Sequence, residues 1–166
     1  MDGYNIIYAW DELNSLAEDN MEGARGRLMD LLCNYQAVRR CNLILVFDAY
    51  RVKGHATEIL DYHNIHVVYT KEAETADQYI EKFAHENARR FDISVATSDG
   101  LEQVIILGQG CRRVSARELW EDLERVKGML REEYLEKPRL KRNSLLEVLP
   151  EKAARELEKL KDKEQE

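Results

Sequence analysis

Four aspartates occupy positions from which they could act together on a phosphate ester. Asp48 and Asp99 each end an apolar run, and Asp77 lies in the first turn of an expected helix. Asp2 stands where a strand before it would end. Carboxylates brought together raise each other's pKa values, and a divalent cation relieves that repulsion. Oxygen-only ligands favour Mg²⁺ or Mn²⁺, which can activate water and stabilise the charge developing on a phosphodiester.

Each acid also has an ordinary structural explanation. An aspartate after a strand often caps the next helix, as Asp99 could, and the helix dipole favours an acid such as Asp77 in a first turn. Both interpretations stay open from the residues alone. The sequence has no G-x-x-x-x-G-K-[ST], no G-x-G-x-x-G and no G-x-S-x-G, so we expect no nucleotide cofactor. The D-x-D-x-[TV] pattern of haloacid-dehalogenase-type phosphotransfer is absent as well.

Patterns along the chain predict alternating helices and strands. Apolar residues at helical spacing predict three main helices, and short apolar runs predict buried strands. The helices are expected over 21–40, 74–90 and 115–136, the last with a capping box from Ser115 and Glu118. Strands are expected over 42–48, 65–70, 93–99 and 111–114. Two further short helices are expected over 55–64 and 100–110, and another over 150–166.

This alternation implies parallel pairing through right-handed crossovers, and therefore an α/β fold, a three-layer sandwich with a central parallel sheet. In such sheets the ligand crevice lies at the carboxyl ends of the strands, where Asp48 and Asp99 stand. We expect one domain over residues 1–136 and a charged, helical C-terminal tail over residues 137–166.

Composition narrows the class of protein. Of 166 residues, 44% are hydrophobic and 34% charged, which supports a real core under a charged surface. The net charge of −7 argues against a general polyanion binder, although an acidic metal site would itself lower the charge. No apolar stretch approaches the length of a membrane span, so no membrane partner is expected. Three cysteines without a C-x-x-C suggest reduced thiols in a cytoplasmic protein.

Five segments resemble the YacP-type branch of the NYN domains, which are PIN-like ribonucleases. They are "DGYNII", "LVFDAY", "YTKEAETADQYIE", "VATSDGLEQ" and "GQGCRRVSARE", in order and with natural spacing over residues 2–136. The resemblance implies a PIN-like fold and a Mg²⁺- or Mn²⁺-dependent endoribonuclease that cleaves mRNA on translating ribosomes. The alternative is a non-catalytic RNA- or ribosome-binding module that keeps the fold.

The resemblance also implies roles for individual residues. The catalytic and metal-binding acids would be Asp2, Asp48, Asp77 and Asp99, supported by Asn5 and Glu74. Arg112, Arg113 and Ser115 match the positions after "GQG" and would contact RNA phosphates. Apart from the resemblance, Lys53 and Lys71 are candidates for RNA contacts because they lie near the same edge, and Tyr4 because it could stack on bases. Family members carry an apolar strand directly before "DGYN", where this sequence has only Met1. We expect either that the recorded start lies downstream of that strand or that "YNIIYAW" fills its place and displaces Asp2.

Overall fold

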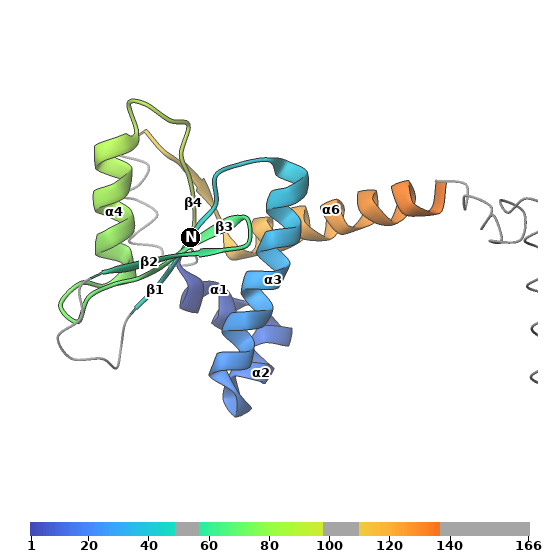
Figure 1. Ribbon diagram of the computed structural model, residues 1–166, viewed down its shortest axis with the longest axis horizontal. Helices are drawn as coiled ribbons and strands as arrows, with labels where there is room; N and C mark the ends of the chain where they lie inside the picture. Colours follow the sequence, from blue (N-terminus) through green and yellow to red (C-terminus); the bar gives the residue numbers. More distant parts are fainter. Residues whose placement is uncertain (49–56, 98–109, 137–166) are drawn as a thin grey trace, which may run out of the picture. The chain divides into compact units, whose positions relative to one another are not determined.

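A computed structural model describes residues 1–48, 57–97 and 110–136 of the chain (Figure 1). Its helices are α1 (Gly3–Ala9), α2 (Asp11–Asp19), α3 (Met21–Arg39), α4 (Ala76–Asn87) and α6 (Ala116–Glu136). Its strands are β1 (Ile44–Phe47), β2 (Glu58–Tyr62), β3 (Ile65–Tyr69), β4 (Ser94–Ala96) and β5 (Arg112–Val114). Residues 1–128 form one compact unit, and the second, residues 129–166, begins with the last turns of α6.

The strands form two small sheets. β1 pairs with β3 in parallel, with Leu45 opposite Val67, and β2 adds to the other edge of β3 in the antiparallel direction. β4 and β5 form a parallel pair in which Val95 lies opposite Arg113. The mixed α/β class is therefore confirmed, while one strand of the first sheet runs against the parallel order that the sequence predicts.

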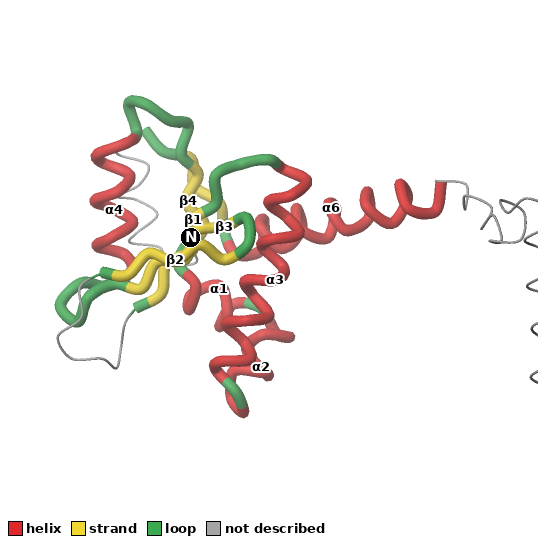
Figure 2. Tube along the Cα trace, viewed as in Figure 1, coloured by secondary structure: helices red, strands yellow, loops and turns green. Residues whose placement is uncertain are grey.

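The first two residues connect the two sheets. Met1 accepts a hydrogen bond from the Val46 N–H (2.9 Å), and Asp2 forms a parallel bridge with Val46. On the other side, the Asp2 N–H donates to the carbonyl of Ala96 in β4 (3.3 Å). Figure 2 shows the N-terminus lying among the strands. Met1 and Asp2 thus occupy a strand position between β1 and β4, and the sequence does not reveal this because the paired residues are far apart in the chain.

Alternate strand residues face two separate cores. Leu45 and Phe47 face a large core built with α1, α2, α3 and α6, whereas Val46 and Val68 face a smaller core under α4. Because successive side chains of a strand point to opposite faces, a strand buried on both faces must be apolar at nearly every position. This burial explains the continuous apolar run "LILVF" and confirms the prediction of a doubly buried strand.

Side-chain caps stabilise the starts of the three main helices, and the predicted capping box of Ser115 and Glu118 is confirmed. Asn20 accepts a hydrogen bond from the Gly23 N–H (2.9 Å) at the start of α3. Thr75 opens α4 with a complete capping box. At α6, Ser115 accepts from the Glu118 N–H (3.2 Å) while its own N–H donates to the Glu118 carboxylate (2.7 Å). These short-range hydrogen bonds are readable from sequence because both partners lie within one helical turn.

Two sequence predictions are wrong. Residues Glu58–Tyr62 form β2 and no helix, because they pair with β3 through a two-residue turn in which His63 takes a positive φ of 51°. Residues Gly3–Ala9 form helix α1, so "YNIIYAW" does not fill a strand position and does not displace Asp2.

The remaining predictions about chain organisation lie in residues 98–109 and 137–166, outside the described part, and the domain boundary at residue 136 stays a prediction. Within the described residues, no helix combines the length and apolar character needed to cross a membrane.

Candidate active site

Asp2 is a buried acid at the junction between a strand position and a helix. Only 8% of the residue is exposed, and its Oδ1 accepts a hydrogen bond from the Asn5 N–H (3.0 Å), which caps α1. Burial raises the pKa of the Asp2 carboxyl to about 6, and the Asp77 and Asp48 carboxylates push it in the same direction. The Asn5 N–H and the charged amino terminus act in the opposite direction. Asp2 is therefore an acid whose charged form is costly in this fold.

Asp48 directly follows β1, and its side chain connects the end of that strand to the start of α4. Its Oδ1 accepts a hydrogen bond from the backbone N–H of Ala76, the first residue of α4. An ionised acceptor at a helix N-terminus is favoured by both hydrogen bonding and the helix dipole. Asp77 comes next in the same first turn, so this hydrogen bond sets the spacing between the Asp48 and Asp77 backbones.

The structure therefore brings three of the four predicted acids to one edge of the strands. Among residues 1–48, 57–97 and 110–136, no three histidine, cysteine, aspartate or glutamate side chains already form a group that could hold a metal ion. Asp2, Asp48 and Asp77 are thus neighbours without being a complete ligand set by themselves. Asp99, the fourth predicted ligand, lies outside the described residues.

The supporting residues lie beside this edge. Asn5 contributes its backbone N–H to Asp2. Glu74 accepts a hydrogen bond from the Thr57 hydroxyl (3.3 Å), and its N–H closes a turn on the carbonyl of Lys71 (3.0 Å). The Lys71 residue is exposed just after β3. Lys53, another predicted RNA contact, lies outside the described residues.

The predicted basic pair, Arg112 and Arg113, does not lie at the strand ends that carry the acids. Arg112 is opposite Ser94, at the amino ends of β4 and β5, whereas Asp2 binds Ala96 near the carboxyl end of β4. Arg112 is exposed and forms an ion pair with Asp92 at 3.5 Å. Arg113 is exposed one position further along β5.

Ser115 follows β5 at the carboxyl end and caps α6 with its hydroxyl. Of the predicted RNA contacts in "RRVS", Ser115 is therefore the one that lies at the carboxyl ends of the strands, where the acids also lie.

Tyr4 belongs to an aromatic row beneath the site. The Tyr4 ring packs edge-on against the Phe47 ring, with 5.2 Å between ring centroids, and Phe47 in turn stacks on Tyr69 with 5.7 Å between centroids. The Tyr4 hydroxyl accepts a hydrogen bond from Arg25 Nη1 (3.2 Å). Phe47 also lies against Gly3, where an added Cβ would stand 2.2 Å from the ring. Tyr4 is half-buried in this packing, and the predicted RNA contact would use only its exposed part.

Two buried threonines at the same strand ends escaped the sequence interpretation. Thr70 follows β3 and is 1% exposed, and Thr97 follows β4 and is fully buried. Their N–H groups continue the ladders, to the carbonyls of Phe47 (3.0 Å) and Val114 (3.2 Å). Both threonines therefore follow the carboxyl ends of strands, at the edge that carries the acids. The sequence could have indicated these two residues, because each threonine directly follows an apolar run that predicts a strand.

Comparisons with known proteins agree with this architecture. The model of the YacP-like NYN domain family matches residues 1–162. The uncharacterized protein YacP of Bacillus subtilis (strain 168) is 43% identical over 143 residues, which cover 83% of this chain and 84% of that protein. The crystal structure of Rae1 (YacP) from Bacillus subtilis matches with a TM-score of 0.68 at 42% identity, over 80% of this chain and 76% of that one. A mutant of that protein matches with a TM-score of 0.70 at 34% identity, over 96% of both chains.

Proposed function

The chain belongs to the YacP-like NYN domain family, and from this premise we propose that it is a divalent-metal-dependent endoribonuclease that cleaves mRNA. The observation that carries the proposal is the juxtaposition of the Asp2, Asp48 and Asp77 carboxylates at the strand ends. Burying an acid beside two others costs stability, and acids perturbed in this way cluster at functional sites. In the proposed fold, the parallel strands β1, β3, β4 and β5 belong to the central layer of a three-layer PIN-like sandwich, and β2 is an antiparallel strand at its edge.

The acids suit Mg²⁺ or Mn²⁺ because they offer only oxygen ligands. Asp2 and Asp48 each use one lone pair of Oδ1 for a backbone hydrogen bond, and their carboxylates would hold the cation with the acceptor capacity that remains. Asp77 and Asp99 would complete the ligand set. When bound, the cation supplies activation of water and neutralisation of charge on the phosphodiester.

The protein's own contribution is to hold these carboxylates in place. The backbone N–H groups of Asn5 and Ala76 fix the orientations of Asp2 and Asp48 before any ligand arrives. Such preorganisation lowers the reorganisation needed when charge develops on the substrate. Ser115, Lys71 and Tyr4 are proposed to contact RNA around the edge, and Arg112 and Arg113 to contact it along β5. Lys53 is proposed as a further RNA contact.

The test is cleavage of a fluorescently labelled RNA in Mn²⁺, Mg²⁺ or EDTA. The wild type should cut only with metal, and Asp77→Asn should lose on the order of 100-fold or more of the rate, because one ligand to the cation is gone. Glu81→Gln, an exposed acid one turn further along α4, serves as the matched control and should keep the wild-type rate. Equal cleavage by wild type and Asp77→Asn would refute the assigned site.

The alternative, a non-catalytic RNA- or ribosome-binding module, is favoured by one observation, since the described residues alone do not complete a metal site. Under this alternative, RNA would be retained in a gel-shift assay and stay intact with Mn²⁺ present. Detection of cut ends that require the metal would exclude it.

We also propose that the protein acts in the cytoplasm on RNA engaged by ribosomes. With a net charge of −7, affinity for free RNA should be weak because phosphate contacts dominate such binding. A large partner such as the ribosome would then supply the missing affinity. Cleavage in a translation reaction should exceed cleavage of the same RNA without ribosomes, and equal rates would contradict this part of the proposal.

A further inference from the structure

Arg25 is a partly buried cation in the second turn of α3, and the nuclease proposal gives it no role. Its side chain is 23% exposed. Nη1 donates a hydrogen bond to the Tyr4 hydroxyl (3.2 Å), and Nη2 pairs with the carboxylate of Glu22 one turn earlier on the helix. The Nε–H is buried and has no hydrogen-bond partner among the described residues. Because a buried donor without a partner costs stability, this guanidinium has binding capacity that the fold leaves unused.

The direction of α3 places Arg25 near the strand ends that carry the acids. Towards its C-terminus, α3 meets the turn before β3, where the Asn64 side-chain amide donates to the carbonyl of Cys33 (3.0 Å). Arg25 precedes Cys33 along the helix by about 12 Å, which is close to the length of a strand such as β3. Burial raises the pKa of the Tyr69 hydroxyl at the end of β3, and the nearby charge of Arg25 opposes that rise. The helix therefore runs back along β3 and brings Arg25 to its carboxyl end.

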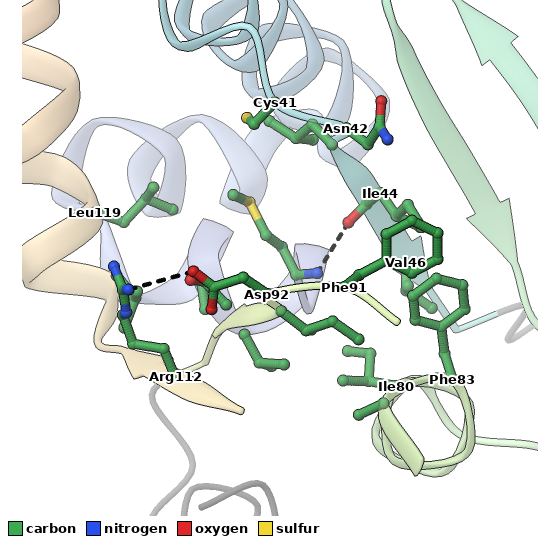
Figure 3. A pocket seen from close by; sticks show the side chains of 18 of the residues that line it. Cys41, Asn42, Ile44, Val46, Ile80, Phe83, Phe91, Asp92, Arg112 and Leu119 are labelled. Carbon is green, nitrogen blue, oxygen red and sulfur yellow. Dashed lines mark hydrogen bonds and ion pairs between the residues drawn. The ribbon is translucent and has the colours of Figure 1, made fainter. Parts of the chain in front are cut away.

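The predicted RNA contact Arg112 lies at the other end of the strands. Figure 3 shows Arg112 directed at Asp92, with which it forms an ion pair at 3.5 Å, and Asp92 precedes β4. Arg25 instead donates to Tyr4, which follows Asp2 in the first turn of α1. Of these two arginines, Arg25 is therefore the one whose contacts lie on the side of the acids.

Glu22 is a replaceable partner for Arg25. Its side chain is 78% exposed, and a surface ion pair between residues one helical turn apart contributes little to stability. The Glu22 carboxylate engages Nη2 and leaves the Nε–H unpaired. A phosphate group offers more acceptor oxygens, and two neighbouring N–H groups of a guanidinium can bind two of them at once. Rotation of Glu22 into solvent would leave this edge of Arg25 to a phosphate.

We propose that Arg25 binds a backbone phosphate of the RNA strand beside the acidic edge, and that Glu22 occupies the guanidinium until RNA arrives. This inference rests on the proposed ribonuclease function and gives the substrate an anchor separate from the metal. Tyr4 holds the guanidinium in place through Nη1 before RNA binds. The phosphate bound by Arg25 flanks the reacting one, so the contact contributes to affinity and not to the rate of the bound complex.

The test measures binding of a fluorescently labelled single-stranded RNA by anisotropy in EDTA, over a range of salt concentrations. Arg25→Gln should raise Kd about tenfold, because one charge-assisted phosphate contact is lost. It should also reduce the slope of log Kd against log salt concentration by about 0.7, the contribution of one phosphate contact with a single strand. Arg27→Gln replaces an exposed arginine of the same helix that pairs with Glu12 (3.2 Å), and this matched control should leave both values unchanged.

Glu22→Gln gives a second result that does not depend on the folding of the arginine variant, because Glu22 is exposed. This substitution should lower Kd about threefold in the wild-type background and have no effect when combined with Arg25→Gln. A tighter complex that persists in the double variant would reflect general charge repulsion and contradict the role assigned to Glu22.

Cleavage in Mn²⁺ separates this inference from the proposed function. Arg25→Gln should raise KM about tenfold and leave kcat within about twofold, a split that a general loss of structure would not produce. Equal Kd and equal salt slopes for wild type and Arg25→Gln would overturn the inference and leave the nuclease proposal standing. A wild type that binds RNA without cutting it would refute the nuclease, and weaker binding by Arg25→Gln would still support the phosphate contact.

Discussion

Replacing Asp2 by asparagine should stabilise the protein at neutral pH. The Asp2 carboxyl has a pKa of about 6 in the fold, mainly because burial disfavours its charge, against an ordinary value of 3.8. An acid with a raised pKa binds its proton more tightly in the folded than in the unfolded state. Stability from this group is therefore fully present below about pH 4 and falls as the pH rises through 6.

The magnitude follows from the shift. About two pKa units at 1.36 kcal/mol each amount to about 3 kcal/mol of stability lost from the wild type between pH 4 and pH 7. Asparagine keeps an oxygen for the Asn5 N–H and carries no charge, so Asp2→Asn escapes this loss. The variant should match the wild type near pH 4 and exceed it by about 3 kcal/mol at pH 7, which corresponds to ~6–12 °C in Tm.

The assay is urea or thermal unfolding at pH 4, 5, 6 and 7 with EDTA present. Asp19→Asn, which replaces an exposed acid at the end of α2, is the control and should change stability by less than about 0.5 kcal/mol at every pH. A difference between Asp2→Asn and wild type that stays constant from pH 4 to pH 7 would refute the reasoning. Added Mn²⁺ should stabilise the wild type at pH 7 and leave the variant almost unaffected.

Three further predictions concern the scaffold. Gly3→Ala should destabilise the fold by about 1–3 kcal/mol in urea unfolding, because the new Cβ would stand 2.2 Å from the Phe47 ring. Trp10→Phe removes a buried indole hydrogen bond to a backbone carbonyl of α6 (2.9 Å) and should cost about 2 kcal/mol in the same assay. Asp122→Asn should lower the Tyr35 pKa from about 12. Burial of the Tyr35 hydroxyl would still raise this pKa, but the carboxylate that accepts its hydrogen bond would be lost. Spectrophotometric titration, with Tyr35→Phe as reference, measures that change, and an unaltered titration would show that Asp122 has no part in it.

Local patterns in the sequence predicted most of the elements correctly. The helices α3, α4 and α6 follow from the spacing of apolar residues, and the capping box of α6 follows from two residues within one turn of each other. The run before Asp48 predicted a strand buried on both faces, and the two cores confirm it. The same reading placed acids after strand ends, where Asp2 and Asp48 do stand.

The tertiary structure decided what depends on distant partners. β2 is a strand because it pairs with β3 across a tight turn, although its own residues are mostly exposed and lack a clear alternating pattern. Met1 and Asp2 hold a strand position because they bond to Ile44, Val46 and Ala96, which are more than 40 residues away. Only this pairing buries Asp2 and sets it near Asp48 and Asp77. Residue types in the sequence thus identify which groups could do chemistry, and long-range pairing decides which of them lie together and which one is buried.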